Sequence, residues 1–304
     1  MSSPNISLKR RTMGDLVFDI IIAVYMIFFL LVTLYPLINV LAVSFNDGTD
    51  ALRGGIHLWP RMFTLKNYQT VLQKSSMGTA AIVTVARTVI GTLSSTFVTS
   101  LLAYVLSRPE YVFKKHLSLL YVVTMYVSGG LIPVFLVYKD LGLTDSFWVY
   151  IIPGMVSAFN MLVMRTYING LPGSLVESAQ IDGAGHFTIF MRIVMPLCLP
   201  VIATIALFTA VGQWNSWFDA MLYNRMSDQY TTFQYELMKL LNSVTNNNAN
   251  VESVKNAVDG GGGQVTPTSV RAAATVITSV PILMIYPFLQ RYFVSGLTIG
   301  GVKE

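Results

Sequence analysis

The 304-residue chain is 53% hydrophobic and only 12% charged, and its mean hydropathy is +0.58. Soluble domains carry about 25% charged residues, so this composition excludes an ordinary water-soluble globular protein. The net charge of +5 comes from scattered basic residues, which indicates contact with anionic lipid rather than with nucleic acid. The single cysteine, Cys198, excludes an intrachain disulfide and argues against a cysteine-based metal site.

Six segments of the chain contain no Asp, Glu, Lys or Arg over at least 18 residues. Each is long enough to cross a bilayer core of about 30 Å as a helix. In chain order they are Ile20–Asn46, Thr88–Ser107, Leu117–Tyr138, Ser146–Met164, Ile193–Phe218 and Ala272–Gln290. The predicted fold is therefore all-α: one membrane domain, residues 1–304, with six transmembrane helices.

The basic triplet Lys9-Arg10-Arg11 stands just before the first apolar segment. That segment is too long for a secretion signal and lacks a small-residue cleavage site, so we interpret it as a retained first span. Basic residues next to a span favour the cytoplasmic side. An even number of spans then predicts that the amino and carboxyl termini are both cytoplasmic.

On this topology the long loop 219–271 faces outside. It contains "FQYELMKLLNSV", in which Phe233, Leu237, Leu240 and Leu241 repeat at helical spacing. The following "NNNAN" and "DGGGGQ" are expected to interrupt any helix. The loop therefore predicts a small external helical lobe on flexible connections.

Motifs for catalysis or nucleotide binding are missing from the sequence. It has no GxxxxGK[ST], HExxH, CxxC or GxSxG pattern, and the glycines 260–263 lack a following Lys-Ser, which suits a hinge. The histidines His57, His116 and His186 fall in different loops and predict no metal site. The apolar segments lack the chain of carboxylates and histidines expected of an ion-coupled transporter. Energy for uphill transport would have to come from another protein.

The polar stretch "PGSLVESAQIDGAGHFTIFMRIVMPLCLP", residues 172–200, separates the fourth and fifth apolar segments. Ser174 and Glu177 have the spacing of a capping box, which predicts a helix starting at Ser174. Gly183 is expected to end this helix in a left-handed conformation. The small side chain of Ala179 would let another protein approach closely, although a simple amphipathic connector is the alternative.

A second helical stretch is expected to run from His186 into the fifth apolar segment. Pro196 and Pro200 fall inside this stretch and would be accommodated by local rearrangement of the backbone.

The sequence "ESAQIDGAGHFTIFMRIVMP" resembles the EAA loop of binding-protein-dependent ABC importer permeases. The matching positions are Glu177, Ala179, Asp182, Gly183, Ala184, Ile193 and Pro196, while Ser178 replaces an Ala and Met195 a Leu. The resemblance extends through residues 126–148, "WNSWFDAM" and the ending "QRYFVSGLTIGGVKE". The chain as a whole is similar to carbohydrate-importer permeases related to the second membrane subunit of the maltose system, especially the complex-oligosaccharide subgroup.

The resemblance implies a permease subunit in the bacterial plasma membrane that transports a carbohydrate. Its implied partners are a second homologous permease subunit, two ATPase subunits that use ATP and Mg, and an extracytoplasmic solute-binding protein. From the composition of the long loop we expect the external lobe, residues 228–268, to contribute to docking of that binding protein. No cofactor would be bound by this chain. Contacts to the ATPase are expected from the segment 167–192, through Glu177, Ala179, Asp182, Gly183, Ala184 and Gly185, and from a tail containing Gly296, Gly300 and Gly301.

The substrate path is predicted from "QWNSWFDA" at the outer end of the fifth segment. Indole faces of Trp214 and Trp217 can stack on sugar rings, and Asn215 and Asp219 can hold hydroxyl groups. The alternative is that the tryptophans anchor the span at the membrane interface and the polar residues pair locally. Rival functions are an ion-coupled secondary transporter, a membrane enzyme and a non-transporting membrane partner protein.

Overall fold

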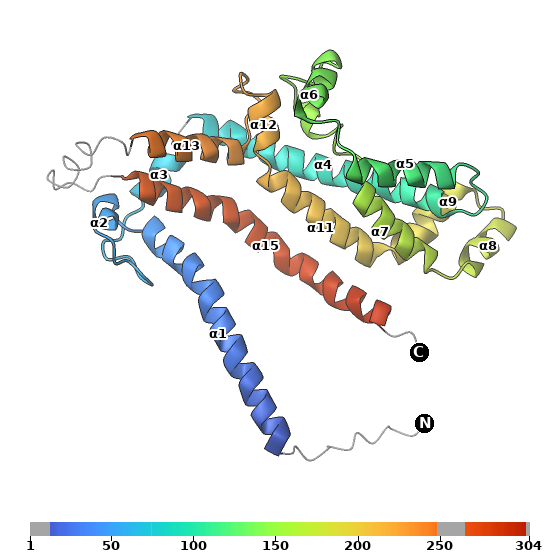
Figure 1. Ribbon diagram of the computed structural model, residues 1–304, viewed down its shortest axis with the longest axis horizontal. Helices are drawn as coiled ribbons and strands as arrows, with labels where there is room; N and C mark the ends of the chain where they lie inside the picture. The colour runs from blue at the N-terminus through green and yellow to red at the C-terminus, as the bar shows by residue number, and fades with distance from the viewer. Residues whose placement is uncertain (1–12, 74, 248–264, 302–304) are drawn as a thin grey trace. The chain divides into compact units, whose positions relative to one another are not determined.

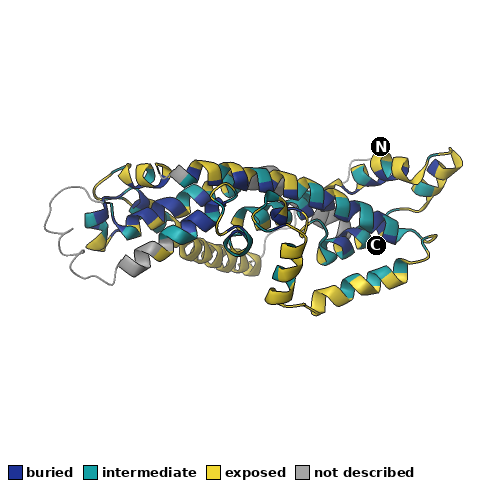
Figure 2. Ribbon diagram, turned by 90° about the horizontal axis from the view of Figure 1, so that it is seen from above, coloured by how far each residue is buried: buried dark blue, intermediate teal, exposed yellow. Residues whose placement is uncertain are grey.

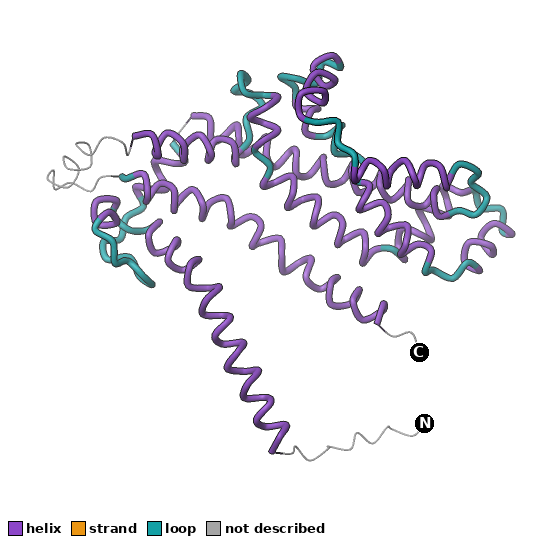
Figure 3. Tube along the Cα trace, in the orientation of Figure 1, coloured by secondary structure: helices purple, strands orange, loops and turns teal. Residues whose placement is uncertain are grey.

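The computed structural model describes residues 13–73, 75–247 and 265–301. Within these ranges the chain forms helices joined by loops, with no strand (Figure 3) and one isolated bridge between Asn46 and Phe63. The all-α prediction is confirmed for this part of the chain. The fold separates into two compact units, Met1–Thr70 with Asn250–Val276 and Val71–Ala249 with Ile277–Glu304, which are described individually.

The first unit contains α1 (Met13–Ser44), α2 (Gly48–Leu52), most of α3 (Lys66–Leu72) and the start of α15 (Pro267–Gly301). Every residue of α1 from Met13 to Leu37 is exposed (Figure 2). So long an exposed apolar surface is unstable in water and requires lipid or a protein partner.

Hydrogen bonds between polar side chains hold the loop that follows α1. Asp47 accepts hydrogen bonds at the N-terminus of α2, and Asn46 Nδ2 donates to Asp50 Oδ2 at 2.9 Å. Arg61 Nε also donates to Asp50 Oδ2, at 3.0 Å. Asn67 Nδ2 donates to the carbonyl oxygen of Asn46 at 2.8 Å. The hydrogen bond from Asn46, helped by Arg61, holds the pKa of Asp50 below its ordinary value against the opposing effect of burial.

The second unit is built along α4 (Ser75–Ser107), against which α7 (Ala158–Asn169), α11 (Leu199–Asn215) and α13 (Phe233–Asn247) pack (Figure 1). Its other elements are α5 (Lys114–Tyr126), α6 (Leu131–Asp140), η1 (Phe147–Tyr150), α8 (Ser174–Ile181), α9 (His186–Ile189), the π-helix η2 (Phe190–Val194), α10 (Met195–Leu197) and α12 (Phe218–Tyr223).

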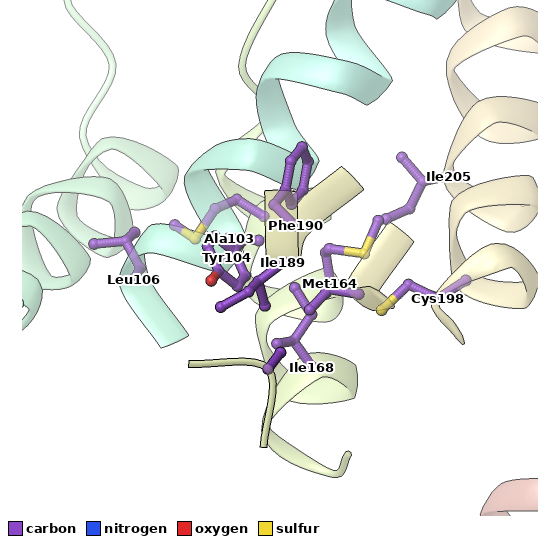
Figure 4. Packing of buried hydrophobic residues seen from close by; sticks show 13 residues of the cluster. Ala103, Tyr104, Leu106, Met164, Ile168, Ile189, Phe190, Cys198 and Ile205 are labelled. Atoms are coloured by element: carbon purple, nitrogen blue, oxygen red, sulfur yellow. The ribbon is translucent and has the colours of Figure 1, made fainter. Parts of the chain in front are cut away.

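A buried hydrophobic cluster, called the α4–α7 cluster below, joins α4, α7, α8, α9, η2 and α11 (Figure 4). Its members include Ala103, Tyr104, Leu106, Met161, Met164, Ile168, Ala179, Ile189, Phe190, Cys198 and Ile205. Residues from α8, α9 and η2 are therefore packed directly on α4 and α7. The polar stretch between the fourth and fifth apolar segments is therefore anchored on the core beside it.

Two helices among the described residues are long and apolar enough to cross a membrane, namely Met13–Ser44 and Ser76–Ser107, each with 32 residues. The pair His186–Leu197 and Leu199–Asn215 passes the same test together but is bent by 83° at Cys198. The second and fifth predicted segments thus correspond to α4 and to this bent pair, and the first to α1.

The third and fourth apolar segments are not single continuous helices, contrary to the prediction. The third is divided into α5 and α6 at residues 127–130, where Gly130 has φ +85°. In the fourth, η1 ends at Tyr150 and α7 begins only at Ala158, with Pro153 and Gly154 between them. Glycine and proline break helices without adding charge, so a search for uncharged segments does not detect such interruptions.

Candidate functional site

The helix predicted in the polar stretch exists as α8, Ser174–Ile181, but the predicted capping box is wrong. The N-cap residue is Gly173, and no side chain caps this end. The carbonyl oxygen of Gly173 accepts hydrogen bonds from the N–H groups of Val176 at 3.0 Å and Glu177 at 3.1 Å. Because the first turn starts one residue earlier than expected, Ser174 is already helical and cannot serve as the cap.

The end of α8 agrees with the prediction for Gly183. This residue has φ +78°, and its N–H donates to the carbonyl oxygen of Gln180 at 3.0 Å. The N–H of Ala184 donates to the carbonyl oxygen of Ala179 at 2.9 Å. Together these bonds form a Schellman motif, which needs a left-handed residue at Gly183. Gly185 has φ −71° and ψ 157°, a conformation open to any residue.

Ala179, predicted to lie where another protein approaches closely, is mostly covered by its own chain. It is only 9% exposed and belongs to the α4–α7 cluster of this chain, and the half-buried Ala184 packs against the same cluster. Glu177 within α8 and Asp182 directly after it are both exposed, and neither carboxylate has a hydrogen bond or ion pair to another described residue. Ile181, between them, is 87% exposed. The segment therefore has an inner apolar anchor and an exposed outer surface that carries the acidic side chains of Glu177 and Asp182.

The continuation into the fifth segment is confirmed. Helical structure runs from His186 through Leu197, with the π-helix η2 before Pro196, and resumes at Leu199. Pro196 and Pro200 cannot donate backbone hydrogen bonds, and π-helical turns and sharp bends are the usual accommodations of such residues.

A second candidate site lies where α4, α11 and α12 meet. Arg87, on α4, is 2% exposed and pairs with Asp219 through Nη2 to Oδ2 at 2.5 Å and Nη1 to Oδ1 at 3.2 Å. Its Nε and Nη2 also donate to Gln213 Oε1, at 3.0 and 2.9 Å. A weaker bond joins Nη1 to the carbonyl oxygen of Ser216 at 3.5 Å. All five guanidinium N–H groups are thereby engaged within the chain.

This network borders a cavity of about 500 Å³, called the Arg87 cavity below. The guanidinium of Arg87 also lies 4.2 Å from the centre of the Tyr150 ring. Such a volume falls in the range of about 300–1,000 Å³ that is usual for small-molecule sites. The lining comprises Arg87, Tyr138, Val149, Tyr150, Pro153, Gly154, Thr209, Gly212, Gln213, Ser216, Phe218, Asp219 and Tyr223.

Of the four residues predicted for the substrate path, the structure places only Asp219 in this cavity. Trp214 Nε1 donates to the carbonyl oxygen of Thr278 at 3.0 Å, and Asn215 Oδ1 accepts from Gln234 Nε2 at 3.2 Å. Trp217 packs edge-on against Phe218, with 5.9 Å between ring centres. Sequence reasoning missed Arg87, whose only signal was a charged residue directly before an apolar segment.

The predicted helix in the long loop is confirmed as α13. Phe233 and Leu237 are buried, and the N–H of Phe233 donates to Thr84 Oγ1 on α4 at 2.8 Å. Residues 248–264, including the predicted hinge at 260–263, and the side chain of Leu241 lie outside the described residues. Gly296, Gly300 and Gly301 occupy the final turns of α15.

Comparisons with known proteins are consistent with these features. No protein-family model matches the chain. The permease protein YtcP of a polygalacturonan/rhamnogalacturonan transport system of Bacillus subtilis is 36% identical over 291 residues, covering 96% of this chain and 100% of the relative. LplC of the same organism is 35% identical over 273 residues, 90% of each protein.

Among solved structures, a chain of a bacterial ABC transporter involved in the import of the acidic polysaccharide alginate superposes with a TM-score of 0.81. It is 30% identical, and the match covers 94% of this chain and 99% of that chain. The helical architecture and these matches define the protein as a membrane transport subunit. The chain belongs to the family of sugar ABC transporter permeases.

Proposed function

We propose that this permease moves an oligosaccharide, rather than a single sugar, through the bacterial plasma membrane. The support is chemical agreement among relatives: YtcP is named for polygalacturonan and rhamnogalacturonan transport, and the AraQ protein of Halalkalibacterium halodurans, 28% identical over 305 residues, for arabinooligosaccharides. These names share a substrate built of several sugar units. They differ in the sugar, so the inference extends to the size class of the substrate.

The proposed topology has six membrane crossings with both termini in the cytoplasm. α1, α4 and the bent pair ending in α11 supply three crossings. The remaining three are assigned to residues of the third, fourth and sixth apolar segments, with the third and fourth crossing as interrupted helices. Broken helices are tolerated at membrane depth where protein or a water-filled cavity surrounds them. The Arg87 cavity adjoins the interruption at Pro153 and Gly154.

The segment containing α8 is proposed to contact an ATPase subunit. The observation that carries this assignment is the exposed outer surface of the segment. It carries Glu177 and Asp182, whose carboxylates have no partner among the described residues, and Ile181, which is 87% exposed. The buried side of the same segment is anchored on α4 and α7. A force applied to this exposed surface would pass to α4 and α7 as a rigid-body movement, which suits alternating access.

The complete importer is proposed to contain a second homologous permease subunit, two ATPase subunits and an extracytoplasmic solute-binding protein. This sequence has no phosphate-binding loop, so ATP and Mg would be bound by the ATPase subunits. The carboxyl-terminal glycines Gly296, Gly300 and Gly301 are assigned to the tail that approaches the ATPase, and the lobe around α13 to docking of the binding protein.

Transport by the reconstituted complex tests this proposal. Proteoliposomes holding both permeases and the ATPases should accumulate an oligosaccharide only when ATP and the binding protein are supplied. The purified chain alone should hydrolyse no ATP. Accumulation driven by a proton or sodium gradient without ATP would instead establish a secondary transporter, and a complex that forms without any uptake would indicate a non-transporting partner.

A further inference from the structure

The wall of the Arg87 cavity combines aromatic rings with hydroxyl groups that have no partner. Tyr138 and Tyr223 both line it, with 5.2 Å between their ring centres. Neither phenol hydroxyl, nor that of Thr209 on the wall from α11, makes a hydrogen bond to another described residue. Tyr150, in contrast, donates its hydroxyl to the carbonyl oxygen of Tyr230 at 2.6 Å and is not free.

The two charged side chains of the cavity, Arg87 and Asp219, differ in their capacity to form a hydrogen bond with a ligand. Arg87 has no free N–H, because Asp219, Gln213 and the Ser216 carbonyl take all of them. The side chain of Asp219 is 25% exposed. Its Oδ2 accepts only from Arg87, whereas Oδ1 also accepts from Ser216 Oγ and from the N–H of Ala220. Oδ2 therefore retains the capacity to accept a hydrogen bond from a ligand hydroxyl.

We propose that the Arg87 cavity is a subsite for one pyranose unit of the transported saccharide, recognised through its ring face and hydroxyl groups and not through a salt bridge. This inference rests on the proposed function as an oligosaccharide permease. The rings of Tyr138 and Tyr223 line the cavity and supply apolar contact for the C–H surface of a sugar. Tyr223 also stacks on Phe135, with 5.8 Å between ring centres, which fixes the position of its ring. The hydroxyls of the two tyrosines, with Thr209 Oγ1 and Asp219 Oδ2, supply the few polar contacts that fix orientation in such pockets.

The same cavity offers no favourable ionic contact to the carboxylate of a ligand. Arg87, the one cation that the described residues contribute to the lining, is already neutralised by Asp219, so an entering anion would meet no free charged donor from this part of the chain. It would also meet the partly exposed carboxylate of Asp219 at close range. An acidic sugar could still bind through its ring and hydroxyls, but its charge would contribute nothing favourable.

Protection of an introduced cysteine tests the subsite in the complete importer. Cys198, the chain's single cysteine, is buried and is first changed by Cys198→Ser. Phe218→Cys then places a thiol in the cavity wall, and Met226→Cys, at a residue that is 90% exposed and outside the lining, is the matched control. The probes are an uncharged galacto-oligosaccharide, an oligogalacturonate of equal length and a polyethylene glycol of similar mass.

The galacto-oligosaccharide is expected to slow maleimide labelling of Phe218→Cys several-fold, and this protection should saturate with its concentration. The expectation is the same whether or not the oligogalacturonate also protects the cysteine. Labelling of Met226→Cys should not change, and the polyethylene glycol should protect neither position. Protection by the oligogalacturonate alone would show an anion site and overturn the inference. Absence of protection by either sugar would also overturn it.

Removal of the hydroxyl groups gives a second, independent measurement. Tyr138→Phe with Tyr223→Phe keeps both rings and should raise the galacto-oligosaccharide concentration for half-protection by roughly tenfold. Tyr230→Phe, outside the cavity lining, should leave it unchanged. An unchanged value in the double variant would contradict the assigned hydrogen bonds. ATP-dependent uptake measured on the same preparations separates the subsite proposal from the proposed function. Uptake of saccharide without protection of the cysteine refutes only the subsite. The absence of any saccharide uptake refutes the proposed function.

Discussion

Arg87 and Asp219 form an ion pair between residues 132 positions apart in the sequence. The sequence around Asp219 predicts contacts only to residues close to it in the chain. The hydrogen bonds from Ser216 Oγ and the Ala220 N–H agree with the local pairing that was given as an alternative. The bond to Arg87 depends on how α4 packs against α11, which no local pattern specifies. A charge at the edge of an apolar segment indicates that a partner is needed, but not which residue provides it.

Breaking this pair from its two sides should have unequal effects on stability. Asp219→Asn leaves Arg87, 2% exposed, charged without a counterion, and should lower the free energy of unfolding by about 3 kcal/mol. Arg87→Met leaves the carboxylate of Asp219, which is 25% exposed and can be hydrated from the cavity, so its cost should be smaller. Denaturant unfolding of the purified importer, with the double variant completing the cycle, measures both costs and their coupling. Equal costs would contradict this asymmetry.

Asp50 should make the loop after α1 sensitive to acid. Its pKa is lowered in the folded chain, chiefly by the hydrogen bond from Asn46. The stabilisation from this group is therefore complete above the unfolded pKa of about 3.9 and is lost as the pH falls through the lower folded value. The difference in melting temperature between parent and Asp50→Asn should be largest near neutral pH and shrink in acid. A difference that grows on acidification would contradict the direction of the pKa shift.

At the scale of elements, a substitution at the end of α8 tests whether the backbone geometry there matters for coupling to the ATPase. Gly183→Val places a β-branched residue at φ +78°, which costs about 1–2 kcal/mol and should change the direction in which Glu177 and Asp182 are presented. We expect loss of ATPase co-purification and of uptake at equal amounts of membrane-inserted chain. Gly54→Val imposes the same strain at φ +71°, also with no atom near the added Cβ, and controls for strain outside the coupling segment. Parental uptake and association in Gly183→Val would reduce the segment to a connector.

The contact between α4 and α11 gives a second prediction at this scale. A Cβ added at Gly91 would lie 2.9 Å from Nε2 of Gln213, the side chain that binds both Arg87 and the Tyr150 carbonyl. Gly91→Ala should therefore displace Gln213 and lower stability by about 1 kcal/mol despite the better helix propensity of alanine. Gly78→Ala, in the same helix with open space around the Cβ, should gain stability. Thermal unfolding of the two variants tests this prediction. A rise in melting temperature in both variants would disprove the packing argument.

Across the whole molecule, the features predictable from sequence were those fixed by local chemistry. The existence of α8, its left-handed end at Gly183 and the helix α13 follow from turn residues and apolar spacing, whereas the capping box assigned to the start of α8 was wrong. The interruptions at Gly130 and Pro153 were missed because uncharged segments were taken as unbroken helices. The inward direction of Ala179 and the cavity beside Asp219 depend on packing between distant elements, and spacing within one segment carries no information about it.

The orientation of the complete chain can be tested at five exposed positions, one in each loop between the proposed crossings. In a background with Cys198→Ser, single cysteines replace Leu58, Val112, Leu141, Asn169 and Met226. An impermeant maleimide added to right-side-out membrane vesicles should label positions 58, 141 and 226, while positions 112 and 169 should react only after permeabilisation. The comparison of Val112 with Leu141 is the most informative, because these residues flank α5 and α6 and the break at Gly130. If that interrupted segment turns back within the membrane, both positions would be labelled from one side. The termini would then lie on opposite sides, and the six-crossing topology would be wrong.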